Sequence, residues 1–252
     1  MTSRRKFIGK AALVTGAAFI STEATGAAAL QNKTDEKKLK IMVAGAHPDD
    51  PETGMGGTIC KYTALGHEVV IVYLTTGEAG IEGVPHSKAA EIRKKEAEKA
   101  CAILKARPYF MGQIDGNCVI TAQWYQKMYE VMSIEKPDMV FTHWPIDTHP
   151  DHRICSNLVF DAWNHSGRHA ALYYFEVCAG AQTQNFQPDT IVDISEVIET
   201  KWKACFVHES QKIKDYYPDD HAKMELFRGL QAGAAYGEGF VHHFQSGHGL
   251  LP

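Results

Sequence analysis

The hydrophobic residues of this chain form short continuous runs that alternate with longer segments in which apolar residues recur at helical spacing. Continuous runs rich in β-branched residues are typical of strands buried on both faces of a parallel sheet. They predict strands over residues 41–44, 69–74, 109–111, 139–141 and 171–177. Helical spacing predicts helices over residues 55–65, 87–104, 121–135 and 152–164. The alternation predicts an α/β fold, a Rossmann-like, doubly wound, mostly parallel sheet with helices on both faces.

The pattern is less regular after residue 177. It predicts a strand over 191–194, helices over 195–207 and 221–235, and a tail from residue 237 with three histidines among glycine and phenylalanine. Exposed tail histidines are commoner than ligands, so no second metal site is expected there. Residues 30–252 contain no repeat or low-complexity tract and have the usual size of one α/β domain. We therefore expect a single domain over residues 30–252.

The first 29 residues differ from the rest. Arg4 and Arg5 form a twin-arginine signature, followed by a modest apolar stretch over residues 11–20 and small residues up to Ala29. The apolar stretch is shorter than the roughly 18 residues of a spanning helix. Residues 1–29 are thus expected to be a twin-arginine signal peptide, giving a periplasmic or extracellular protein without a stable membrane anchor. The alternative is a cytosolic protein with an apolar N-terminus.

Charge and cysteine content exclude some classes of protein. The net charge is −4 and the sequence has no basic stripe, so nucleic-acid binding has no electrostatic basis. The six cysteines include no close pair, and zinc-ribbon or redox spacing is absent. Export would permit disulfides without requiring them. Buried free thiols are therefore expected.

Two polar loops follow the first and fourth predicted strands, over His47–Asp50 and His149–His152. In the doubly wound order 3-2-1-4-5, strands one and four are neighbours, and ligands bind at their carboxyl ends. Neighbouring carboxylates repel unless a cation or a shared proton relieves them. One such loop alone could be an ordinary surface turn. Two such loops, each after a predicted strand, favour a metal site.

The segments Ala46-His47-Pro48-Asp49-Asp50 and His149-Pro150-Asp151-His152 resemble the PIG-L family of zinc-dependent sugar N-deacetylases, which has the LmbE-like fold. Weaker similarities lie at residues 74–80, 93–96, 201–211 and 228–240. The resemblance implies a zinc cofactor, with ferrous iron as the alternative metal. It also implies the ligand set His47, Asp50 and His152.

Roles for the other loop residues follow from the chemistry of such a site. Bound zinc lowers the pKa of its water to near 7, but a base must still take a proton. Asp49 adjoins a ligand without binding the metal, so it is expected to be the general base and later the proton donor. His149 is expected to donate to the oxyanion, with Asp151 orienting it and keeping it charged. The alternative is that His149 and Asp151 have a structural role only, in a turn in which Asp151 caps the following helix.

Arg93 resembles the arginine of the family's Arg-x-x-Glu helix, which implies contact with sugar hydroxyls. The alternative is a surface arginine paired with Glu96. Some family members of sugar-thiol pathways carry a tyrosine two residues before the position of His149. This chain has Asp147 there, so that substrate preference does not transfer.

The sequence predicts an exported, metal-dependent enzyme that removes the acetyl group from an N-acetylglucosamine-like sugar or glycoconjugate. One alternative is a hydrolase of a different amide with the same zinc site. Another is a carbohydrate-binding protein that has kept the metal without catalysis. A homo-oligomer is compatible with the sequence.

Overall fold

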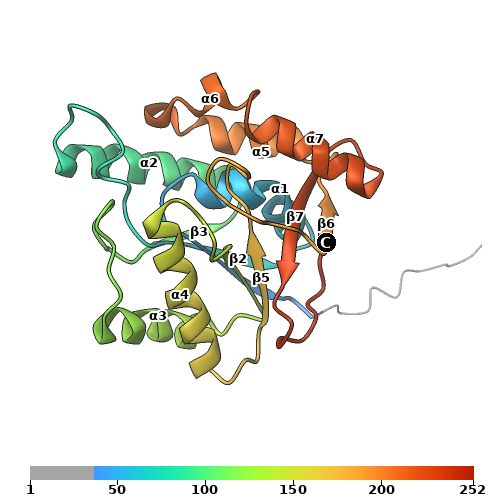
Figure 1. Cartoon of the computed structure of the whole chain (residues 1–252), viewed down its shortest axis with the longest axis horizontal. Coiled ribbons are helices and arrows are strands. Elements are labelled where there is room, and N and C mark those ends of the chain that lie inside the picture. The colour runs from blue at the N-terminus through green and yellow to red at the C-terminus, as the bar shows by residue number, and fades with distance from the viewer. Residues whose placement is uncertain (1–36) are drawn as a thin grey trace, which may run out of the picture. The chain divides into compact units, whose positions relative to one another are not determined.

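The computed structural model describes residues 37–252, which form one compact unit. The predicted signal peptide at residues 1–29 lies outside the described residues. A seven-stranded sheet runs through the unit in the order β3-β2-β1-β4-β5-β7-β6 (Figure 1). The strands are β1 (Lys40–Gly45), β2 (Glu68–Tyr73), β3 (Arg107–Phe110), β4 (Met139–His143), β5 (Ala171–Phe175), β6 (Thr190–Asp193) and β7 (Gly237–His242). The helices are α1 (Asp50–Ala64), α2 (His86–Leu104), α3 (Ala122–Glu135), α4 (Pro150–His165), α5 (Ile198–Phe206), α6 (Ile213–Tyr216) and α7 (His221–Ala232), with a 3₁₀ turn over Glu209–Gln211.

The predicted doubly wound α/β fold is confirmed. Strands β3, β2, β1, β4 and β5 are parallel and follow the expected order 3-2-1-4-5. Strand β1 pairs with β2 on one side and β4 on the other, so it is central. The carboxyl ends of β1 and β4 are therefore adjacent.

The C-terminal tail differs from the expectation. It forms β7, which pairs antiparallel with both β5 and β6. Its sequence, Gly-Glu-Gly-Phe-Val-His, has too few apolar residues to show the alternation of a strand. The strand is instead held by tertiary packing, because Phe240 is buried and its ring lies edge-on to Phe141 at 5.3 Å.

Successive residues of the central strand face two separate cores. Ile41 and Val43 pack with residues of α1, α2 and α5, whereas Met42 and Ala44 pack with residues of α3 and α4. Figure 1 shows these two groups of helices on opposite faces of the sheet. Burial on both faces explains the continuous apolar run of the strand. The polar residues therefore begin only after the strand ends, at its carboxyl edge.

Helix α1 begins at Asp50, five residues before the predicted start. Pro51 is tolerated in its first turn, where no intrahelical N–H bond is lost. At Met55 the backbone leaves helical geometry (φ −151°, ψ 24°). The Glu238 carboxylate of β7 then accepts the N–H groups of Gly57 (2.8 Å) and Thr58 (2.7 Å). The sequence suggested a loop before residue 55 because proline and glycine interrupt the apolar pattern there. After the break at Met55, the contacts from β7 hold the rest of the helix.

All six cysteines are free, as predicted, and all but Cys178 are buried. Within the part of the chain that the structure describes, no helix combines the length and apolar character needed to cross a membrane.

Candidate active site

The two polar loops meet at the carboxyl edge of β1 and β4. The His47 Nε2 atom of the first loop lies 3.3 Å from Asp151 Oδ2 of the second. The backbone N–H of Ala46 donates to His143 Nε2, at the end of β4, over 2.9 Å. A cavity of about 600 Å³ opens over this edge. Its lining includes His47, Asp49, Asp50, Arg93, His149 and His152.

Asp50 is the centre of the site. Its Oδ2 lies 3.1 Å from His47 Nδ1 and 3.4 Å from His143 Nε2, and its Oδ1 lies 3.4 Å from His152 Nε2. Burial alone would raise the pKa of Asp50, but the three imidazoles outweigh it and hold that pKa well below its usual value. Asp50 is therefore a carboxylate that faces three potential nitrogen ligands.

These residues fit a divalent metal ion. Among residues 37–252, the donor atoms of three sets lie within 4.8 Å of one another: Asp50, His143 and His152; His47, His149 and His152; and His47, Asp115 and Asp151. Imidazole nitrogen and carboxylate oxygen are ordinary zinc ligands. The structure thus brings the predicted ligands His47, Asp50 and His152 together. It also places His143 beside Asp50, with its Nε2 already accepting the Ala46 N–H. The sequence analysis missed His143 because it ends a strand and belongs to no motif.

Asp147 lies behind His152. Its Oδ2 is 3.2 Å from His152 Nδ1, and it accepts bonds from the His149 N–H (2.7 Å) and the Thr183 hydroxyl (3.0 Å). Burial lowers the pKa of His152, but Asp50 and Asp147 outweigh it and raise that pKa to about 9. A carboxylate on the far nitrogen is the usual device that orients a metal-binding histidine. Here it directs Nε2 towards Asp50.

Asp49 has an unusual backbone, with φ 113° and ψ −32°. Positive φ is costly for a residue other than glycine and persists only where surrounding contacts hold it. The Asp49 N–H donates to Glu52 Oε2 over 3.2 Å, and the buried Glu52 carboxylate also accepts the Tyr73 hydroxyl (2.6 Å) and contacts His208 Nε2 (3.1 Å). The adjacent aspartates therefore occupy different environments, Asp50 among imidazoles and Asp49 at the cavity wall.

Arg93 reaches Asp49 from helix α2. Its Nη2 donates to Asp49 Oδ2 (3.0 Å) and to the Pro48 carbonyl (2.6 Å), and its Nη1 donates to the Gly77 carbonyl (3.1 Å). Arg93 is only 3% exposed, so the surface alternative is wrong. Glu96 instead accepts bonds from Ser210. Contact of Arg93 with a sugar stays a prediction.

The pKa of Asp49 reflects two opposing causes. Burial raises it, the Arg93 guanidinium lowers it, and the net value is about 6. A carboxyl group with this pKa is mostly ionised at neutral pH and still basic enough to accept a proton.

The roles expected for Asp151 need correction. Its carboxylate accepts the Gly116 N–H (2.7 Å) and lies beside His47, so it does not orient the His149 ring. It is not the helix cap either, because His149 is the N-cap of α4 and its Nδ1 accepts the Asp151 N–H over 3.3 Å. Burial, His47 and His152 lower the pKa of His149, so the structure does not keep that ring charged.

Asp115 is a site residue that sequence reasoning missed. Its Oδ1 lies 3.1 Å from His47 Nε2, and its Oδ2 accepts the Ala79 N–H over 3.0 Å. Asp115 and Asp151 thus both face the second nitrogen of His47. The only signal in the sequence is its place after the third strand, at the edge of the sheet where the other two loops end.

Comparison with known proteins decides the family. The model of the family described as PIG-L, GlcNAc-PI de-N-acetylase, matches residues 42–163, which include both loops. The diacetylchitobiose deacetylase of Thermococcus kodakarensis is 31% identical over 219 residues, covering 79% of this chain and 81% of the relative. The chain belongs to the PIG-L family. Its relatives are LmbE-like deacetylases, as the two motifs had indicated.

Solved structures support the same conclusion about the fold of this PIG-L protein. The N,N'-diacetylchitobiose deacetylase of Pyrococcus horikoshii has a TM-score of 0.72 and 29% identity, with coverage of 85% and 86% of the two chains. The 4-carboxy-2-hydroxymuconate hydratase GalB of Pseudomonas putida has a TM-score of 0.73 at 23% identity, with coverage of 85% and 100%. That likeness shows the fold alone. Because one fold serves a deacetylase and a hydratase, the reaction has to be argued from the site.

The contact between Asp147 and His152 yields a prediction about metal affinity. Asp147→Asn is expected to weaken metal binding about 10- to 100-fold, the usual cost of removing a carboxylate that orients a histidine ligand. Competition with a chromogenic chelator measures the dissociation constant. Asp161→Asn is the control, because Asp161 is exposed on α4, the helix that carries His152. Equal affinities for both variants would remove Asp147 from the metal site.

The contact between Arg93 and Asp49 yields a prediction about pH. A general base works ionised, so activity is lost as pH falls through its pKa. Arg93 lowers that pKa. Arg93→Gln should therefore move the acidic limb of kcat/KM to higher pH, and Arg93→Lys should move it less. Arg107→Gln, whose partner Glu135 is remote from the cavity, should leave the limb in place. An unmoved limb in Arg93→Gln would contradict Asp49 as the titrating base.

Proposed function

We propose that this PIG-L protein is a metal-dependent hydrolase that removes the acetyl group from an N-acetylglucosamine-like sugar or glycoconjugate. Zinc is the proposed metal, with ferrous iron as the alternative, and His47, Asp50 and His152 are the proposed ligands. The observation that carries the proposal is Asp49, a half-buried carboxylate at the cavity wall. It is next in the chain to Asp50, but Arg93 and its own backbone conformation hold it apart from the imidazoles. Binding alone would need no such base.

The bound metal would supply a Lewis acid that lowers the pKa of a water molecule from about 15.7 to near 7. Asp49 accepts the proton of the attacking water and returns it to the departing amine. Arg93 keeps the Asp49 carboxylate in place. Because His149 Nδ1 accepts the Asp151 N–H, a neutral His149 carries its proton on Nε2. That N–H is the proposed donor to the carbonyl oxygen as negative charge develops on it.

Acetate release tests the proposal. The purified protein should release acetate and free amine in equal amounts from N,N'-diacetylchitobiose or N-acetylglucosamine. Chelation should abolish the release, and added Zn²⁺ or Fe²⁺ should restore it and identify the better metal. Sugar binding without acetate release would favour a carbohydrate-binding protein. Faster release from simple N-acetyl amides than from sugars would favour a hydrolase of a different amide.

We also propose export through residues 1–29, with Arg4 and Arg5 as the signal. Replacing both arginines with lysine should keep the precursor in the cytoplasm, because twin-arginine export depends on this pair. Fractionation of cells that express either form measures the effect. Undiminished periplasmic or extracellular activity of the Lys-Lys form would contradict this route.

A further inference from the structure

The cavity over Asp50 holds several carboxylates and one guanidinium. Its lining includes Asp49, Asp50, Asp115 and Asp220, and within residues 37–252 Arg93 is its only Lys or Arg. Arg93 already donates to Asp49 and to two backbone carbonyls. Its Nε has no partner but is buried, with Gly77 packed against the guanidinium. No Lys or Arg of the lining is therefore free to bind an anion.

Two further cationic side chains are already bound to other groups. Lys201 is buried and paired with Glu225 (2.8 Å) and Glu238 (2.7 Å). Arg153 donates Nη1 to the carbonyls of Asp147 and Thr148, and it is not part of the lining. Burial and Lys201 lower the pKa of His221, a lining residue, to about 4, so its ring is neutral.

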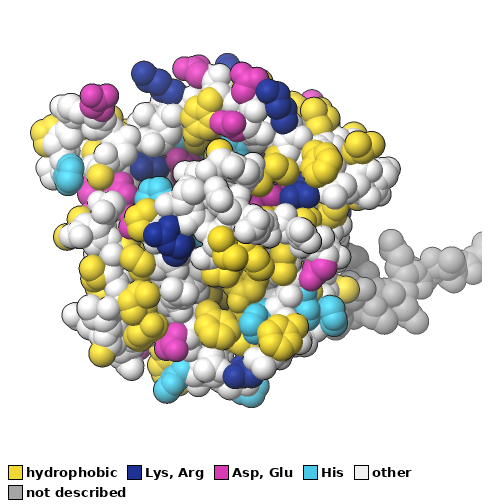
Figure 2. Space-filling view, viewed as in Figure 1, with side chains coloured by type: hydrophobic (Ala, Val, Ile, Leu, Met, Phe, Trp, Pro, Cys, Tyr) yellow, Lys and Arg dark blue, Asp and Glu magenta, His cyan; other side chains and the backbone are white. Residues whose placement is uncertain are grey.

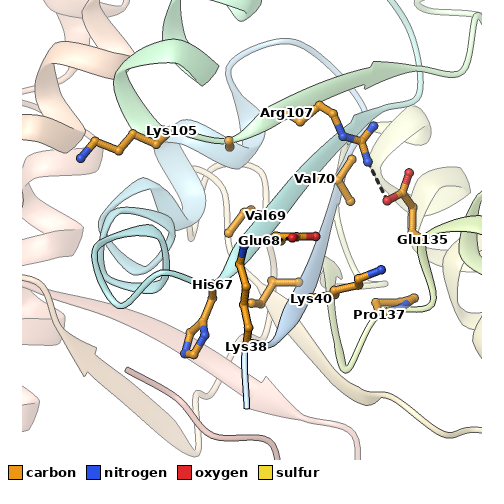
Figure 3. Close-up of a pocket in the computed structure, with 12 residues that line it drawn as sticks. Lys38, Lys40, His67, Glu68, Val69, Val70, Lys105, Arg107, Glu135 and Pro137 are labelled. Atoms are coloured by element: carbon orange, nitrogen blue, oxygen red, sulfur yellow. Dashed lines mark hydrogen bonds and ion pairs between the residues drawn. The ribbon is translucent and has the colours of Figure 1, made fainter. Parts of the chain in front are cut away.

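Four basic side chains lie together at the opposite edge of the sheet. Lys38, Lys40, Lys105 and Arg107 line a separate cavity of about 360 Å³ at the amino ends of β1, β2 and β3 (Figure 3). On the face shown in Figure 2, Lys and Arg side chains are scattered among acidic ones. These four side chains thus belong to a cavity separate from the one over Asp50.

The cavity lining also contains an exposed carboxylate and several uncharged polar side chains. Asp220, the residue before α7, is exposed and makes no ion pair with any described residue. The lining also includes the Tyr216 ring, 37% exposed, and the amides of Gln182 and Gln211, of which Gln211 already donates to the Gly80 carbonyl and the Ser210 hydroxyl. Amides bind hydroxyl groups in either direction, and a phenol ring offers an apolar face. This part of the lining suits the ring and hydroxyls of a sugar.

We propose that the cavity selects N-acetylated sugars whose attached group is uncharged over those that carry a phosphate or carboxylate there, and that Asp220 is a specificity-determining residue. The inference rests on the proposed deacetylase function and names the substrate class of the same site. An anionic group near Asp220 would meet repulsion that no Lys or Arg of the lining offsets. At the effective dielectric of a partly open cleft, one such contact costs roughly tenfold in kcat/KM.

A matched pair of substrates tests the proposal on the metal-loaded protein. The carboxymethyl glycoside of N-acetylglucosamine and its methyl ester differ in charge but hardly in size. The ester should have a kcat/KM at least about tenfold higher, mainly through KM, and high salt should shrink the difference. Asp220→Asn should reduce the ratio, and Asp220→Lys should bring it to unity or reverse it. Asp215→Lys, on the same segment but outside the lining, is the control for net charge.

The outcomes separate the inference from the function on which it rests. Equal or faster cleavage of the carboxylate by the unmodified protein would overturn the inference and leave the deacetylase function standing. No acetate from either glycoside, nor from N,N'-diacetylchitobiose, would remove the function itself. An Asp215→Lys effect as large as that of Asp220→Lys would overturn the role of Asp220. If Asp220→Lys fails to fold, Asp220→Asn still tests the charge.

Discussion

Asp49→Asn is expected to lower kcat by about 10²- to 10⁴-fold while the protein keeps its full metal content. The substitution removes the proton acceptor but leaves Asp50 and its three imidazoles in place. Asparagine is also among the residues that best tolerate positive φ, so the backbone at this position should survive. Steady-state kinetics with metal analysis of the same sample measures both effects.

The KM of Asp49→Asn should stay close to that of the unmodified protein, because a lost base affects the transition state more than the ground state. Thermal unfolding of the metal-loaded variant serves as the control for folding. Loss of metal by Asp49→Asn would assign Asp49 to the ligand set. Normal turnover would refute the proposed mechanism.

Asp50→Ala should abolish metal binding and activity together. Its carboxylate lies within 3.4 Å of three imidazoles, so its loss removes the charge that they share and leaves the ion without a ligand. Zinc content by atomic spectroscopy and acetate release by enzymatic assay are the measurements. His47→Ala and His152→Ala should behave alike. A full metal equivalent in Asp50→Ala would mean that the ion is held by another set, such as His47, His149 and His152.

The sequence could predict which loops meet, because apolar runs identify buried strands and the doubly wound order places the ends of strands one and four side by side. It could not predict His143 or Asp115, since each enters the site alone from a strand end or a third loop. The error over Asp151 has a similar origin. Spacing places Asp151 near His149, but only coordinates show that the carboxylate turns to Gly116 and His47.

The start of α1 was missed because Pro51 and Gly54 interrupt the apolar pattern; the structure holds this turn through the bond between the Asp49 N–H and the Glu52 carboxylate. Strand β7 was missed because it has no periodic apolar pattern, and its Glu238 binds the N–H of Gly57 in α1. Local sequence patterns report local structure, and this contact joins residues 181 positions apart.

That contact also sets when the metal centre can be completed during synthesis. Gly57 of the helix that begins with Asp50 leaves the ribosome 181 residues before Glu238, the carboxylate that ties it to the sheet. Domains generally fold as units, and long-range contacts form late. We therefore expect the nascent chain to hold an unfinished site until residues 237–242 emerge, so that metal loading follows translation rather than accompanying it.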